Sequence, residues 1–281
     1  MQVRFWGVRG LVASPGGSFR RYGGDTLCVE LVTEAGARLV LDLGTGGIAL
    51  GNALAAAAAT GGSKRLAVLL SSTHLDHIHG LPFFVPALAP GWDLTIMGPS
   101  QSGSDISGIL DGALNPNYSP LYGVENLAPK LDMTTLAEGE LSWDGIRIIT
   151  RELPNGKTPS LGLRIEADGV TLAYLADVEY EGPPCSAAID LASEVDLLIH
   201  DGMGTLPMVV KRRGAPVVRP EDALQVAREA EAKSLLLYRH DPDLTDSAME
   251  ILLADLRHSA PGVPIDAAQV GTSLDLRART R

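Results

Sequence analysis

Residues 72–80 read Ser72-Thr73-His74-Leu75-Asp76-His77-Ile78-His79-Gly80 and directly follow residues 66–71, a run with pure strand character. A buried strand that ends in His and Asp points these side chains beyond its carboxyl end. Imidazole and carboxylate groups are the donors that divalent metals such as Zn²⁺ bind in proteins. The alternative is a loop whose histidines bond only to backbone. The close spacing favours a site descended from a metal centre.

The composition is that of a globular protein with a well-buried core. The chain has 281 residues, of which 45% are hydrophobic and 20% charged, and no repeat or linker is evident. We therefore expect a single domain over residues 1–281. A net charge of -11 argues against nucleic acid as a partner, since phosphate binding requires a basic face. The basic cluster Lys211-Arg212-Arg213 is interpreted as a solvated loop.

The cysteines and the apolar segments bear on the compartment. Cys28 and Cys185 have no CxxC spacing, which favours free thiols in a reducing compartment over a single bridge. Residues 1–10 lack the apolar core of a signal peptide, and the Ala-rich segment 48–60 is too short to span a membrane. The sequence predicts a soluble, cytoplasmic protein without membrane contact.

Strand patterns separated by turns dominate both halves of the chain. In the first half they predict strands at 3–5, 26–33, 37–43, 66–71 and 93–97, and helices at 48–59 and 80–88. Residues 100–130 are rich in loop formers. In the second half we expect antiparallel strands at 143–149, 161–165 and 170–175, strands ending at 201 and 238, and helices from 220 and over 247–257.

Polar residues recur where these later strands end. Asp177 follows one strand, and the pair His200-Asp201 ends the next. The last strand runs into Arg239 and His240. A rearranged site that uses His200, Asp201 or His240 therefore stays open at this point.

Short motifs over almost the whole chain carry a resemblance to a known family. They are residues 1–10, 21–26, Leu41-Asp42-Leu43-Gly44-Thr45-Gly46, the loop 72–77, Ala176-Asp177, and Leu237-Tyr238-Arg239-His240-Asp241-Pro242. These segments resemble the metallo-β-lactamase fold superfamily, most closely its phosphodiesterase-like branch. The resemblance implies an α+β fold, a four-layer αββα sandwich of two mixed sheets, with the metal site at one edge of both sheets.

The chemistry that the resemblance implies is hydrolysis by a hydroxide held between two Zn²⁺-type ions. The family places the motif His-x-His-x-Asp-His at residues 72–77 and a bridging Asp at the end of a later strand. Carried over to this chain, the metal ligands are His74, Asp76, His77 and Asp177. Catalysis would then depend on Asp76.

The chain departs from this pattern in three places. Ser72 replaces the first histidine of the motif, and the loop Leu153-Pro154-Asn155-Gly156 lacks the family's histidine. Arg239 falls where the last histidine belongs. The neighbouring His240 is shifted by one residue, which turns its side chain to the opposite face of a strand end. Arg239 would supply beside Asp76 and Asp177 the positive charge that a metal otherwise provides.

Two functional hypotheses follow. The first is a hydrolase of a phosphodiester or related ester with a reduced site, holding at most one ion of Zn²⁺ or another divalent metal. The second is a catalytically silent relative that acts as a binding or regulatory module without a metal, with Arg239 in place of the metal charge. Apolar residues around 81–84 and 203–210 are expected to be exposed, which permits a homodimer.

Overall fold

Two β-sheets form the centre of the molecule, whose computed structural model describes residues 1–156, 158–203 and 219–277. The first sheet contains β1 (Gln2–Gly7), β2 (Cys28–Val32), β3 (Arg38–Leu41), β4 (Arg65–Leu69), β5 (Asp93–Pro99), β6 (Lys130–Leu136) and β14 (Ser273–Asp275). The second contains β7 (Gly139–Trp143), β8 (Ile146–Leu153), β9 (Ser160–Ala167), β10 (Val170–Leu175), β11 (Leu197–Asp201), β12 (Leu235–Tyr238) and β13 (Ile265–Ala267).

Both sheets mix parallel and antiparallel pairs. The strand order is β14-β1-β2-β3-β4-β5-β6 in one sheet and β13-β12-β11-β10-β9-β8-β7 in the other. Pairing is antiparallel from β14 to β3 and from β7 to β10. It is parallel from β3 to β6 and from β10 to β13. The expected antiparallel strands before Asp177 are therefore confirmed.

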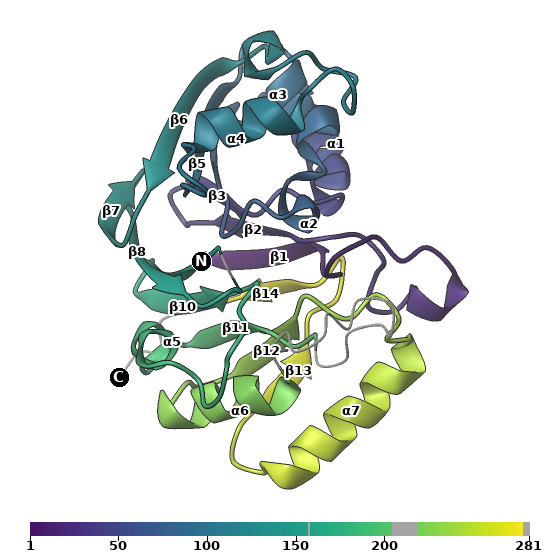
Figure 1. Cartoon of the computed structure of the whole chain (residues 1–281), viewed down its shortest axis with the longest axis vertical. Helices are drawn as coiled ribbons and strands as arrows, with labels where there is room; N and C mark the ends of the chain where they lie inside the picture. Colours follow the sequence, from purple (N-terminus) through teal and green to yellow (C-terminus); the bar gives the residue numbers. More distant parts are fainter. Residues whose placement is uncertain (157, 204–218, 278–281) are drawn as a thin grey trace.

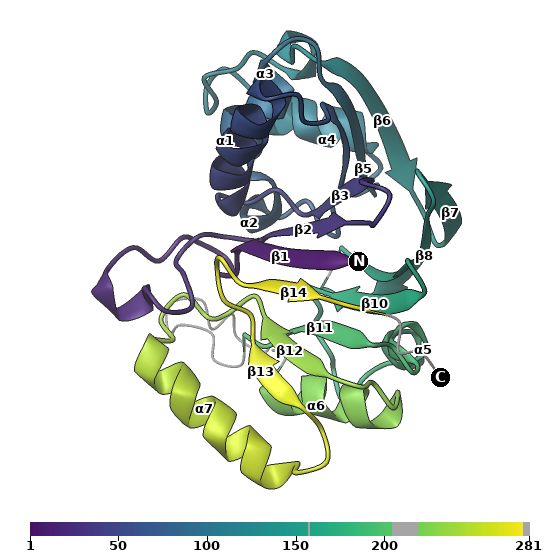
Figure 2. The ribbon, with the colours of Figure 1, turned by 180° about the vertical axis from the view of Figure 1, so that it is seen from behind.

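Helices cover the outer face of each sheet. Those over the first sheet are α1 (Gly46–Ala59), α2 (Leu75–Ile78), α3 (Val85–Leu88) and α4 (Ile106–Ala113). Those over the second are α5 (Ser186–Ala192), α6 (Pro220–Glu229) and α7 (Asp246–Ser259). Figures 1 and 2 show the two groups on opposite sides of the molecule with the sheets between them. The predicted αββα sandwich is confirmed.

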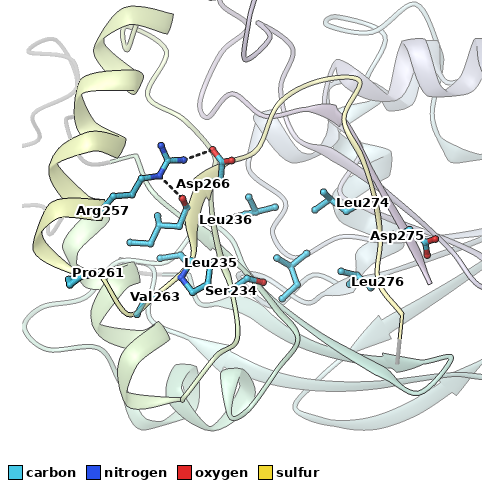
Figure 3. A pocket seen from close by; sticks show the side chains of 14 residues that line it. Ser234, Leu235, Leu236, Arg257, Pro261, Val263, Asp266, Leu274, Asp275 and Leu276 are labelled. Atoms are coloured by element: carbon cyan, nitrogen blue, oxygen red, sulfur yellow. Dashed lines mark hydrogen bonds and ion pairs between the residues drawn. The ribbon is translucent and has the colours of Figure 1, made fainter. Parts of the chain in front are cut away.

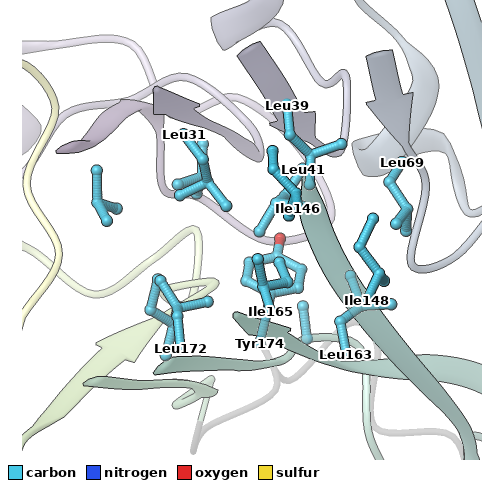
Figure 4. Packing of buried hydrophobic residues seen from close by; sticks show 14 of the residues in the cluster. Leu31, Leu39, Leu41, Leu69, Ile146, Ile148, Leu163, Ile165, Leu172 and Tyr174 are labelled. Atoms are coloured by element: carbon cyan, nitrogen blue, oxygen red, sulfur yellow. The ribbon is translucent and has the colours of Figure 1, made fainter. Parts of the chain in front are cut away.

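Apolar side chains from the facing sheets fill the space between them. Leu31, Leu39 and Leu41 from the first sheet meet Ile148 and Leu163 from the second (Figure 4). All five are fully buried. Because alternate residues of a strand face opposite sides, the same strands also present apolar side chains to the helices. Burial on both faces explains the continuous apolar runs in the sequence.

Some local predictions are wrong. The single strand expected at 143–149 is broken by a turn at Asp144 and Gly145, both in the left-handed region, so that β7 and β8 form a hairpin. Most of the segment 100–130 is loop, as expected, but it also holds α4, which begins after Asp105, whose carboxylate caps the helix by accepting from Gly108 N at 2.8 Å. The helix expected at 80–88 is divided into a short 3₁₀ helix, η2 (Leu81–Phe83), and α3. Each of the two has a proline in its first turn.

The surface predicted around residues 81–84 is less apolar than expected. Phe83 is exposed, but Leu81 and Phe84 are buried in the core beneath α1 and α3. Residues 204–210 of the second apolar segment, and Lys211-Arg212-Arg213, lie outside the described residues.

Cys28 and Cys185 are both free. Within the described ranges no helix is long and apolar enough to cross a membrane. The reading of residues 1–281 as one domain stays a prediction.

Candidate functional site

The candidate site lies where strands of both sheets end at one common edge. Asp42 follows β3, Ser72 follows β4, Asp177 follows β10, Asp201 ends β11, and Arg239 follows β12. Parallel neighbours end at the same edge of a sheet, so the strand order brings these residues together. The site is therefore a product of both sheets.

The loop that carries the histidines packs directly on the turn after β3. Gly80 N donates to Leu43 O at 2.8 Å. A Cβ on Gly44 would lie 2.3 Å from the carbonyl oxygen of Asp76, and a Cβ on Gly80 would lie 2.1 Å from that of Gly44. Only glycine permits this approach. The glycines of the turn thus position the His/Asp loop.

Three residues of the site have a left-handed backbone, which non-glycine residues seldom adopt. The φ angles are 57° at Asp42, 56° at Asp177 and 54° at Arg239. Asp42 and Arg239 directly follow the last residue of a strand, and Asp177 lies two residues past the end of β10. The turn of the backbone at these positions brings the three side chains into the centre. Such conformations cost on the order of 1–3 kcal/mol each and persist where the surroundings fix them.

Arg239 is the centre of the site. Its Nε lies 3.0 Å from Asp76 Oδ2, its Nη2 lies 2.9 Å from Asp177 Oδ1, and its Nη1 lies 3.1 Å from Asp201 Oδ2. The Arg239 side chain is only 5% exposed. Burial alone would lower the pKa of the guanidinium, but the three carboxylates hold it well above its ordinary value. Arg239 is therefore a permanent buried cation.

Asp177 has both carboxylate oxygens engaged. Besides the contact with Arg239, its Oδ2 lies 2.6 Å from His74 Nδ1 and accepts from Asn155 Nδ2 at 2.8 Å. Burial opposes ionisation, but Arg239 and the hydrogen bond from His74 together hold the pKa of Asp177 far below its usual range. Asn155 was not predicted as a site residue. Its position in the loop that lacks the family's histidine was the only available signal.

Asp76 is held in a similar way. Its Oδ2 accepts from Leu11 N at 2.8 Å as well as from Arg239. Burial raises the pKa of this carboxyl, yet the charges of Arg239 and His77 outweigh burial and lower it. Asp76 is thus held as a carboxylate through its Oδ2 oxygen.

His77 is fully buried and faces a fourth carboxylate. Its Nδ1 lies 2.9 Å from Asp42 Oδ2, which also accepts from Tyr174 Oη at 2.6 Å. Burial alone would lower the pKa of His77, but Asp42 and Asp76 raise it to about 9. Its Nε2 lies 3.8 Å from both Asp76 Oδ2 and Asp177 Oδ2 and has no hydrogen-bond partner. The carboxylates around His77 therefore favour the protonated ring.

Asp201 joins the site, whereas His200 and His240 do not. Burial raises the pKa of Asp201 to about 6, although the charge of Arg239 opposes the shift. His200 is buried on the other side of β11, where its Nε2 lies 3.0 Å from Tyr180 Oη. His240 is buried with its Nε2 2.8 Å from Ala268 O. The one-residue shift after Arg239 has turned His240 out of the site.

The remaining candidates of the loop differ in exposure. Ser72 is fully buried, and its hydroxyl accepts from His74 N at 3.2 Å. His79 is exposed at the end of α2. The His74 side chain is 46% exposed. A half-exposed imidazole oriented by a buried carboxylate is able to donate to or accept from a ligand.

The donors of this site do not fit a divalent metal ion in the present arrangement. Three carboxylate oxygens that a metal would need, Asp76 Oδ2 and both oxygens of Asp177, are engaged by Arg239, Leu11 N, His74 and Asn155. In the part of the chain that the structure describes, no three His, Cys, Asp or Glu residues are arranged to hold an ion. The unpartnered Nε2 of His77 is one nitrogen beside a fixed cation, which repels a second one.

Comparison with known proteins identifies the fold independently. A family model described as "Beta-lactamase superfamily domain" matches residues 38–240. The metallo-beta-lactamase fold protein YhfI from Bacillus subtilis is 19% identical, with a TM-score of 0.67 over 98% of this chain and 99% of that chain. A diphosphatase from the PhnP family is 15% identical, with a TM-score of 0.66 over 98% of each chain. Zn²⁺-bound PqqB from Methylobacterium extorquens is 16% identical, with a TM-score of 0.66 over 98% of this chain and 100% of that chain. No curated protein matches the sequence.

At these identities the solved structures establish the fold and nothing finer. The match of the family model is evidence for family membership, because it spans well over half of the chain, from β3 to His240. It includes Asp42, the His/Asp loop, Asp177 and Arg239. The chain belongs to the beta-lactamase superfamily, as the motifs predicted.

Proposed function

We propose that this chain is a metal-independent member of its superfamily that acts as a binding or regulatory module. The observation that carries the proposal is the set of contacts from Arg239 to Asp76, Asp177 and Asp201. A guanidinium with its donors spread over three carboxylates takes the part that a metal ion plays in hydrolases of this fold. It also ties the loop after β4 to the strand ends of the second sheet.

The charges argue against the hydrolase hypothesis. A two-metal hydrolase needs cations that lower the pKa of a bound water and stabilise the charge developing on the substrate. Here the positive groups near the carboxylates are Arg239 and His77, and both are buried. Three carboxylates surround one guanidinium, so the centre is formally negative and repels the phosphate of a diester.

His74 is the group of this site that a ligand reaches most readily. Asp76, His77, Asp177, Asp201 and Arg239 are all buried, whereas His74 is nearly half exposed. Its Nδ1 is occupied by Asp177, which leaves Nε2 for a ligand. This arrangement supports recognition at the rim of the site rather than chemistry at its centre.

The decisive experiment is metal content. The purified chain is incubated with Zn²⁺, Mn²⁺ or Fe²⁺, desalted and analysed for bound metal, and its melting temperature is measured with and without each ion. We expect no stoichiometric metal and no rise in melting temperature.

The opposite result would restore the hydrolase with a reduced site. About one equivalent of tightly bound metal, together with hydrolysis of bis(p-nitrophenyl) phosphate that is lost in both Asp76→Ala and His77→Ala, would overturn the proposal. Neither variant alone is sufficient, because both residues also contribute to the buried charge network.

We further propose that the partners do not include nucleic acid, since a net charge of -11 disfavours binding to the phosphates of a nucleic-acid backbone. A filter-binding assay with single- and double-stranded DNA and RNA at low salt tests this. Retention that weakens as salt increases would contradict it.

A further inference from the structure

A cavity of about 480 Å³ lies beside the candidate site, between α2, η2, α4 and the loop that follows α4. Its walls include Leu75 and Ile78 from α2, Phe83 from η2, Leu110 from α4 and Tyr118 from the loop. None of the residues that line it is an Asp, Glu, Lys or Arg. The volume falls in the range of about 300–1,000 Å³ that is usual for small-molecule sites.

The helix α2 has two faces with different tasks. Asp76 and His77 point to the buried charge network, as their contacts with Arg239 and Asp42 establish. Leu75 and Ile78, on the same four-residue helix, line the cavity. A ligand in the cavity would therefore lie against the element that carries the site residues.

The rim of the cavity is apolar and open to water. Leu75 is 59% exposed, Phe83 is 51% exposed and Tyr118 is 85% exposed. Large apolar side chains exposed together around one concavity are a mark of a binding surface. Polar groups are few, and those nearest the rim are His79, the Tyr118 hydroxyl and Ser119.

A second cavity has different properties. It has a volume of about 580 Å³ and is lined by residues of β13 and β14, the edge strands of the two sheets, and by residues at the end of α7 (Figure 3). Its rim holds Asp266 and Asp275, and its one basic group, Arg257, is paired with Asp266 at 3.2 Å and donates to Ile265 O. It shares no residue with α2, and nothing in its lining identifies a ligand.

We propose that the cavity beside α2 binds a small uncharged apolar molecule, aromatic or branched aliphatic, with one polar group directed at His79 or the Tyr118 hydroxyl. An uncharged ligand is required because the walls provide no counter-charge and the neighbouring centre is negative. The inference deepens the proposed function, on which it rests, by naming the ligand class of the binding module.

The test uses the neutral fluorescent probe N-phenyl-1-naphthylamine, titrated into the full chain. We expect a saturable rise in emission. Gly112→Phe introduces a bulky ring at a residue that lines the cavity, and a Cβ at this position would meet no atom within 4 Å. This variant should bind the probe at least about tenfold more weakly.

The matched control is Gly182→Phe. Gly182 is an exposed loop residue whose Cβ would also meet no atom within 4 Å, and it does not line the cavity. Probe binding should be unchanged there. Phe83→Ala is a second variant, which removes an exposed apolar side chain from the cavity wall without filling the cavity. It should weaken probe binding by a smaller factor than Gly112→Phe does.

Several results would overturn the inference. One is equal probe binding by wild type and Gly112→Phe, and another is no saturable binding at all. A third is a homodimer, seen by sedimentation, that Leu75→Asp converts to a monomer while probe binding persists. In that case the occupant of this surface would be a second copy of the chain. Metal uptake by the chain with intact, Gly112-sensitive probe binding would refute the proposed function but leave the pocket standing. A metal-free chain without probe binding would refute the pocket alone.

Discussion

Arg239 Nε lies 3.0 Å from Asp76 Oδ2, although 163 positions separate the two residues in the sequence. Asp76 belongs to the loop after the first sheet's β4, and Arg239 follows β12 of the second sheet. The contact therefore crosses between the two halves of the sandwich. A single buried side chain thus links the two sheets at their common edge.

Removing the guanidinium should strongly destabilise the fold. Arg239→Ala leaves three buried carboxylates without their cation, and breaking a buried ion pair in this way costs about 3–5 kcal/mol. Arg239→Lys keeps the charge but loses the planar fork, so it should fall between the alanine variant and wild type. Urea unfolding curves measure both.

Lys130→Ala is the control for that series. Lys130 forms an exposed ion pair with Asp93 at 3.4 Å, and its side chain is 82% exposed. Exposed pairs contribute little, so the free energy of unfolding should not change measurably. Equal stability of Arg239→Ala and Lys130→Ala would contradict the central role of Arg239.

Restoring the family's histidines should restore metal binding. The double variant Ser72→His with Arg239→His returns two imidazoles beside His74, Asp76 and Asp177 and removes the repelling cation. We expect it to retain zinc after desalting and to gain melting temperature with added Zn²⁺.

The single variant Ser72→His is the comparison. It adds a donor but leaves Arg239 in place, so it should bind no more zinc than wild type. If the single variant bound zinc as tightly as the double one, Arg239 would not be what keeps the ion away.

Asn155 should prove to be a structural partner of Asp177. Its amide donates at 2.8 Å to a buried carboxylate, and Asn155→Ala would cost about 1–3 kcal/mol because the charged acceptor loses a donor out of contact with water. Asn126→Ala is the control, since the Asn126 amide donates to the Tyr122 carbonyl on the surface. Comparable losses in both variants would count against this role.

The stability of the chain should depend on pH through His240. Burial lowers the pKa of His240 to about 3, whereas a histidine in an unfolded chain titrates near 6.5. As the pH falls below about 6.5 the unfolded state takes up the proton first, so stability is lost, by up to about 1.4 kcal/mol per pH unit.

The variant His240→Asn separates the contribution of His240 from those of other titrating groups. His200, with its pKa lowered to about 4 by burial, acts in the same direction as His240. Asp201 acts oppositely, because its pKa is raised to about 6 and its contribution is lost as the pH rises through that value. The slope of unfolding free energy against pH between 6.5 and 4 should therefore be smaller in the variant. Parallel profiles would show that His240 is not held neutral.

Local patterns in the sequence were enough for the fold and for half of the site. The strands that end shortly before Ser72 and Asp177, and the strand that ends at Asp201, could be recognised because apolar runs stop there and polar residues follow. Ser72 and Arg239 could also be singled out, since the resemblance assigns histidine to both positions. The residues at which helices and strands begin and end were harder to predict. The start of α4 depends on a capping residue, and the turn between β7 and β8 depends on residues with a left-handed backbone.

What only the tertiary structure decided is which further side chains join the site and which turn away from it. From the sequence, through the family resemblance, came His74, Asp76, His77 and Asp177, and the expectation that Arg239 lies beside Asp76 and Asp177. That Asp201 completes the contacts of Arg239, that Asn155 supports Asp177, and that His200 and His240 turn away depend on the pairing of β10, β11 and β12. The left-handed backbone at Arg239 then directs its guanidinium inward. Arg239 and Asp201 lie 38 positions apart and come within 3.1 Å of each other because β11 and β12 pair in parallel, and the residues around either one do not by themselves specify that pairing.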